Sequence, residues 1–114
     1  METLNITIQV LPEKRRELML ACRSIVDQTR QKKYCQSSLI RQEESNAVII
    51  MLKQSWSNWD AVKRYLQSDL FTVLLGAIKL LGQSYEIKIN DVSQTDGQKF
   101  VKSAREENPF KELT

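Results

Sequence analysis

The segment AVIIMLKQSW, residues 47–56, constrains the fold of this chain more than any other stretch. Its composition is typical of a β-strand, and both sets of alternating side chains are apolar: Val48, Ile50 and Leu52 in one set, Ala47, Ile49 and Met51 in the other. A strand of this kind is stable only where both of its faces are covered. If helices cover one face, the other exposes an apolar patch, which usually marks an interface. We therefore expect a two-fold homodimer whose sheets close against each other.

The preceding segments predict a strand, a helix and a second strand. Residues 4–10, LNITIQV, alternate strictly between apolar and polar side chains, which is typical of a strand. Apolar residues recur at helical spacing from about Pro12 to Gln31. Residues 35–42, CQSSLIRQ, fit a second strand, and a polar turn over residues 43–46 leads to residues 47–56.

Two helices and a strand are predicted after residue 56. Ser57 or Asn58 can cap a helix that runs through Leu66, and Ser68 can cap a second helix that ends at Gly82. Residues 84–92, SYEIKINDV, alternate again and predict the last strand.

The order of these elements is strand-helix-strand, repeated once. It predicts an α+β fold of the ferredoxin-like βαββαβ type, with helices on one face of an antiparallel sheet and two chains forming a dimeric α/β barrel. The 114 residues suit one domain. We assign residues 1–92 to that domain and residues 93–114 to a polar C-terminal tail or short helical arm.

Composition excludes several classes of function. The chain has no histidine and two cysteines, so a metal or haem site lacks its usual ligands. A net charge of +3 is too small to favour nucleic acid. The basic cluster at residues 30–33 is either a solvated helix end or an anion site. Cys22 and Cys35 indicate reduced thiols in a cytoplasmic protein, and no apolar run is long enough to cross a membrane.

Several residues carry a resemblance to a known family. Trp56, Ser68 and Phe71 stand in the register of a recurring family pattern, and Cys35 matches within the strand YCQSSLIRQ. Over about residues 3–92 the chain resembles the antibiotic biosynthesis monooxygenase (ABM) superfamily of dimeric α+β barrels. It departs from that pattern at Gln54, where family members have an acidic residue, and at Leu75, where the haem-degrading branch has histidine.

The resemblance implies cofactor-free oxygenation of a phenol, anthrone or quinol. On that basis Asn5 and Tyr65 are candidate catalytic residues: Asn5 would donate to a substrate oxygen, and Tyr65 would hydrogen-bond to the substrate or move a proton. The candidate substrate pocket comprises Trp56, Trp59, Phe71, Leu75 and Ile78. We expect no cofactor and no metal, and no haem in particular because histidine is absent.

Simpler interpretations stay open for these residues. Asn5 can hydrogen-bond inside the dimer barrel, Trp56 can anchor the packing of a strand end, and the apolar candidates can be core. Whether the chain is an enzyme is also open. The alternatives are a cofactor-independent monooxygenase acting on a small aromatic ligand, a non-catalytic binding or regulatory dimer of the same fold, and a dimerising unit whose tail recruits another protein.

Overall fold

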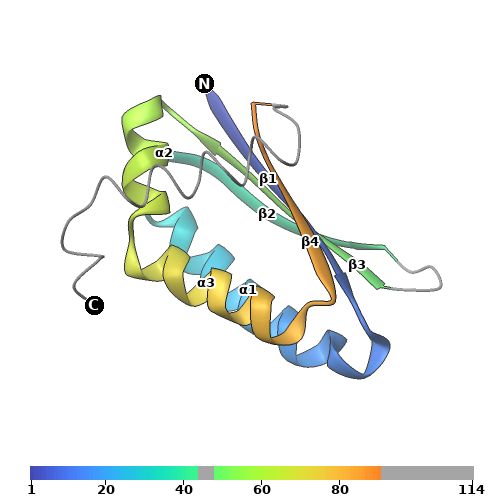
Figure 1. Cartoon of the computed structure of the whole chain (residues 1–114). Coiled ribbons are helices and arrows are strands. Elements are labelled where there is room, and N and C mark those ends of the chain that lie inside the picture. The colour runs from blue at the N-terminus through green and yellow to red at the C-terminus, as the bar shows by residue number, and fades with distance from the viewer. Residues whose placement is uncertain (44–47, 91–114) are drawn as a thin grey trace.

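A computed structural model of the chain describes residues 1–43 and 48–90. Figure 1 shows a sheet with its helices gathered on one side. The elements in chain order are β1 (Glu2–Val10), a 3-10 turn (Pro12–Lys14), α1 (Arg15–Arg30), β2 (Cys35–Glu43), β3 (Val48–Trp56), α2 (Trp59–Leu66), α3 (Asp69–Leu81) and β4 (Ser84–Ile89). The predicted tail, residues 93–114, lies outside the described residues.

The strands form an antiparallel sheet in the order β2-β3-β1-β4. In the centre of this sheet Ile6 lies opposite Leu52 on one side and Ile87 on the other. Because cross-strand partners point to the same face, these side chains lie together beneath the helices, where α1 and α3 lie side by side (Figure 1). The predicted ferredoxin-like α+β fold is therefore confirmed.

Side-chain caps place both helices of the second half. The Asn58 side-chain oxygen accepts a hydrogen bond from the Ala61 amide at 2.9 Å, so Asn58 rather than Ser57 is the cap of α2. The Ser68 hydroxyl accepts from the Phe71 amide at 3.2 Å and caps α3, as predicted. Each cap satisfies an amide that has no partner within its helix.

Gly82 ends α3 as predicted, but not by the left-handed conformation usual at helix ends. Its φ is −79°, a value that any residue can adopt. What requires glycine is close packing, since a Cβ atom here would lie 2.6 Å from the Ile78 carbonyl oxygen and 3.0 Å from the Ile8 side chain. The glycine therefore allows α3 to turn tightly over β1.

Two predicted boundaries differ most from the structure. The predicted helix over Pro12–Gln31 starts with a 3-10 turn and becomes α-helical only at Arg15. The last strand ends at Ile89, because Asn90 turns the chain with a φ of 51°. Residues 44–47, which include most of the predicted turn, lie outside the described residues.

The two faces of the sheet differ in burial. The helix-covered face carries the apolar core, with Leu4, Ile8 and Ile50 fully buried. On the opposite face Ile49 and Met51 are half-buried and Leu39 is exposed. The predicted homodimer would bury these apolar side chains. The pairing of two chains stays a prediction.

Candidate small-molecule site

Three aromatic rings meet at one end of the helical layer. Trp56 ends β3, Tyr65 lies in the last turn of α2, and Phe71 lies in the first turn of α3. The Trp56 and Tyr65 ring centroids are 4.9 Å apart with a tilt of 32°, and Tyr65 meets Phe71 edge-on at 5.3 Å. All three side chains are buried. These geometries are favourable for aromatic pairs, so the cluster is a rigid element.

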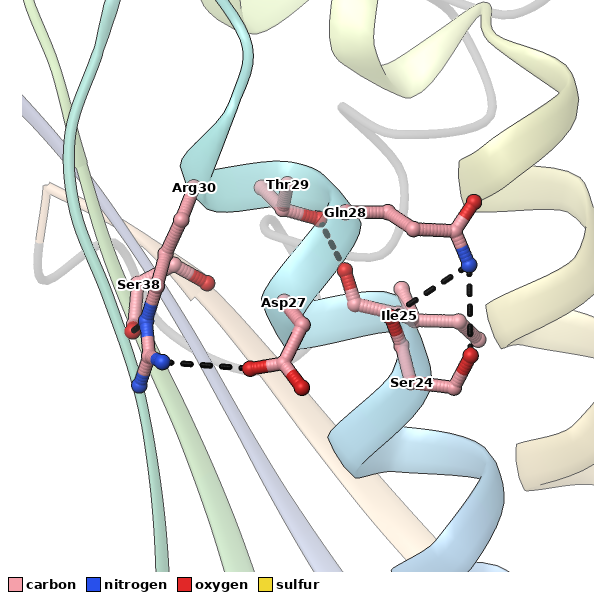
Figure 2. Close-up of polar contacts among 7 residues, drawn as sticks. All are labelled: Ser24, Ile25, Asp27, Gln28, Thr29, Arg30 and Ser38. Carbon is pink, nitrogen blue, oxygen red and sulfur yellow. Dashed lines mark hydrogen bonds and ion pairs between the residues drawn. The ribbon is translucent and has the colours of Figure 1, made fainter.

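A chain of hydrogen bonds runs beneath the rings. The Trp56 indole nitrogen donates to Gln54 Oε1 at 3.3 Å, and Gln54 Nε2 donates to the Tyr65 hydroxyl at 3.1 Å. Thr29 of α1 also hydrogen-bonds to the Tyr65 side chain. The Thr29 hydroxyl in turn donates to the Ile25 carbonyl at 2.6 Å, as Figure 2 shows. The polar groups of the cluster are thus paired inside the protein.

The Tyr65 phenol is neutral at physiological pH. Burial raises the pKa of Tyr65 above its ordinary value, and the hydrogen bonds with Gln54 and Thr29 only partly oppose this effect. A neutral phenol can donate a hydrogen bond or a proton but is a poor base. Of the two tasks proposed for Tyr65 from the sequence, this environment favours donation.

A pocket of about 280 Å³ opens over the aromatic pair. Residues from the α1–β2 turn, the end of β3, α2 and the start of α3 line it: Lys32, Lys33, Tyr34, Trp56, Ala61, Arg64, Tyr65 and Ser68. Three of these residues are aromatic and three are cationic; Tyr34 is the exposed ring, because Trp56 and Tyr65 are only 2% and 3% exposed. The volume lies at the lower end of the range for ligand sites, which suits a ligand of one or two rings.

The structure places the other predicted pocket residues in the packing. Phe71 and Ile78 are fully buried core residues, and Leu75 is half-buried against that core. Trp59 is also half-buried against the core and is not among the residues that line the pocket. Of the residues predicted from sequence, Trp56 and Tyr65 are the two that reach the pocket.

Asn5 lies on the other face of the sheet. In the register of β1 it stands opposite Lys53 and Lys88, whereas the adjacent Leu4 stands opposite Gln54 and Ile89 on the helix-covered face. Successive residues of a strand point to opposite faces. The structure therefore does not bring Asn5 and Tyr65 into one site within a chain.

Sequence reasoning did not assign Lys33, Tyr34, Arg64, Gln54 or Thr29 to the site. The sequence hinted at a role for Lys33 only, because an anion site was one of the two interpretations of the basic cluster at residues 30–33. From the sequence, Gln54 was noted only because members of the ABM superfamily have an acidic residue at its position. Its role as the link between Trp56 and Tyr65 depends on the fold, which no local pattern reveals.

Across residues 1–43 and 48–90 no group of three or more histidine, cysteine or acidic side chains is placed to hold a metal ion. No helix in this part of the chain is long and apolar enough to span a membrane.

Comparisons with solved structures identify the fold. A protein from Deinococcus radiodurans, named as a candidate antibiotic biosynthesis monooxygenase, matches with a TM-score of 0.73 and 21% identity over 82% of this chain and 93% of its own. A second structure named as an antibiotic biosynthesis monooxygenase matches with a TM-score of 0.71 and 18% identity over 81% and 98%. A conserved protein from Methanosarcina mazei matches with a TM-score of 0.68 and 26% identity over 77% and 88%.

The remaining comparisons gave no match. No family model matches the sequence, and no curated protein matches it. The structural matches cover nearly the whole of each solved chain, at low sequence identity. The predicted resemblance to the ABM superfamily is thus confirmed for the fold, and this protein has the fold of the antibiotic biosynthesis monooxygenases.

Proposed function

We propose that this protein uses dioxygen, without a cofactor, to oxygenate a small aromatic or quinol-like molecule in the pocket over Trp56 and Tyr65. The observation that carries the proposal is the tilted Trp56–Tyr65 ring pair, which forms part of the wall of a pocket of about 280 Å³. A rigid aromatic wall suits a flat ligand. Further support comes from the shared fold of proteins named as antibiotic biosynthesis monooxygenases.

The proposed chemistry makes modest demands on the protein. A substrate with an acidic C–H or O–H group loses a proton, and the resulting anion gives electrons to dioxygen. For an anthrone-type methylene, one oxygen atom becomes the new carbonyl, and the other leaves as water with both hydrogens. The pocket has to hold the anion in place and limit the access of water.

Tyr65 and Asn5 have different places in this proposal. Tyr65, as a neutral phenol, would turn its one O–H from Thr29 to the oxygen of the substrate or the intermediate. Its present bonds to Gln54 and Thr29 hold the ring in position. Asn5 stands on the open face, so it would act only within the interior of a dimer.

We also propose that two chains pair through the open face of the sheet. The half-buried Ile49 and Met51 and the exposed Leu39 support this arrangement, because pairing would remove them from water. Location in the cytoplasm stays a prediction.

One observation favours a second function, ligand binding without chemistry. None of the described residues that line the pocket is a carboxylate, the chain has no histidine, and Gln54 stands where the family has an acid. A protein without a general base can still bind an aromatic molecule, so a binding or regulatory dimer is the alternative.

Oxygen consumption with anthrone and with 1,4-dihydroxynaphthalene tests the proposal. We expect uptake by the native protein, and a loss of about tenfold or more in Tyr34→Ala, which removes an exposed wall of the pocket without disturbing the core. Leu80→Ala is the control, since Leu80 is 81% exposed and outside the pocket. Binding of these molecules with no uptake of oxygen would contradict the enzyme and support the binding protein.

A further inference from the structure

Three cationic side chains contribute to the pocket, and none of them has an acidic partner among the described residues. Lys32 and Lys33 belong to the turn between α1 and β2, and Arg64 belongs to α2. Within residues 1–43 and 48–90 no carboxylate forms an ion pair with any of them, whereas Arg30 pairs with Asp27 and Lys88 with Glu86. Resting on the proposed function, we infer that the pocket selects a planar aromatic ligand with a negative charge, namely a phenolic carboxylate.

The first argument is the position of the charges around one ring. The Lys33 ammonium lies 5.4 Å from the Tyr34 ring centroid, and the Arg64 guanidinium carbon lies 5.7 Å from it. Cation–π attraction holds both groups at this ring. Both positive charges therefore lie at one ring of the pocket lining, and an anion bound beside that ring would be attracted by each of them.

The second argument is that the turn is held in place before any ligand binds. The Lys32 amide donates to the Thr29 carbonyl at 3.0 Å, and the Ser57 amide donates to the Tyr34 carbonyl at 3.0 Å. Beside the turn, Arg30 Nε donates to the Ser38 carbonyl at 2.8 Å and joins α1 to β2 (Figure 2). A turn fixed at both ends loses little freedom on binding, which favours affinity.

The third argument links charge to chemistry. The described residues of the pocket lining include no carboxylate that could act as a base, yet oxygenation needs the anion of the substrate. Nearby cations favour the charged form of an acidic group and lower its pKa. The same three side chains would therefore bind the carboxylate and ease ionisation of the adjacent phenol, a task otherwise given to the acid that Gln54 replaces.

Calorimetric titration under argon tests the inference separately from turnover. The probes are 1,4-dihydroxy-2-naphthoate and its methyl ester, which differ in charge. We expect the native protein to bind the acid about tenfold more tightly than the ester, since each surface ion pair contributes a fraction of a kcal/mol. The variant K32Q/K33Q/R64Q should lose that preference. The variant K14Q/R16Q/K79Q, which removes three exposed charges outside the pocket, should keep it.

The outcomes distinguish this inference from the proposed function. Equal affinity for acid and ester, equal loss in both triple variants, or no binding of either probe overturns the inference. Tight, charge-dependent binding of the acid with no oxygen uptake overturns the proposed function and leaves the inference intact. Oxygen uptake at equal rates with acid and ester supports the function and overturns the inference.

Discussion

On β1, Leu4 and Ile6 are fully buried beneath the helices, whereas Asn5 and Thr7 lie on the face that no described helix covers. The covered face is closed by apolar packing along most of its length. The proposed ligand site is the pocket over Trp56, at the end where the α1–β2 turn and α2 meet. The open face mixes polar and apolar side chains over a broad area, which suits a second chain. The proposed ligand and the proposed second subunit would therefore meet opposite faces of the sheet.

The largest expected effect comes from the covered face. Leu4→Ala removes a side chain with 0% exposure and should lower the free energy of unfolding by about 2–5 kcal/mol. Thr3→Ala, at the neighbouring position on the open side, should change it by less than about 1 kcal/mol. Urea denaturation of both variants measures the difference. An equal loss of unfolding free energy in the two variants would contradict the assignment of Leu4 to the covered face and Thr3 to the open face.

The next effect concerns the open face and the association of chains. Met51→Lys places a charge among the apolar side chains of this face and should weaken a dimer by about a hundredfold or more, because an unpaired charge is costly to bury. The fold should be retained. Sedimentation velocity measures association, with Leu80→Lys as a control at an exposed position on α3. A stable monomer of the native protein at micromolar concentration would remove the proposed interface.

Gly82→Ala probes the place where α3 closes onto β1. A new Cβ would meet the Ile78 carbonyl at 2.6 Å and the Ile8 side chain at 3.0 Å, so we expect a loss of about 1–3 kcal/mol in unfolding free energy. Gly76→Ala is the matched variant. No atom lies within 4 Å of its added methyl group, and the exchange should stabilise the helix by up to about 1 kcal/mol. Thermal unfolding measures both variants. The same change in stability for Gly82→Ala and Gly76→Ala would contradict the close packing at Gly82.

The last prediction concerns the buried thiol of Cys22, whose ionisation changes the free energy of unfolding only at alkaline pH. Burial raises the pKa of Cys22 from 9.0 to about 11. Because the folded protein disfavours the thiolate, the stability due to this group is complete below pH about 9 and is lost as the pH rises through about 11. Urea titrations from pH 7 to pH 11 should fall less steeply for Cys22→Ala than for the native chain. Parallel pH profiles would contradict the burial of the thiol.

Much of the fold could be predicted because its signals are local. The alternation of β1, the caps at Asn58 and Ser68 and the doubly apolar β3 each depend on a few neighbouring residues. These signals define the element order, and the element order limits the topology. Details such as the tight approach at Gly82 depend on contact with β1, which is distant in sequence.

The candidate site could be predicted only in part, because it joins residues from five segments. Trp56 and Tyr65 were assigned through the resemblance to the ABM superfamily, but that resemblance does not show that Asn5 points away from them. The alternation of β1 contained that information, since Asn5 is out of phase with Leu4 and Ile6. The approach of Lys33 and Arg64 to one ring comes from the meeting of a turn and a helix, and no sequence pattern encodes it.

Mapping by NMR of the native protein with 1,4-dihydroxy-2-naphthoate under argon tests most directly where the ligand binds. We expect chemical-shift changes at the Trp56 indole N–H and at the backbone amides of Lys33, Tyr34 and Arg64. Changes confined to Asn5 and its neighbours on the open face, or spread evenly over the chain, would contradict a ligand site on the helix-covered face.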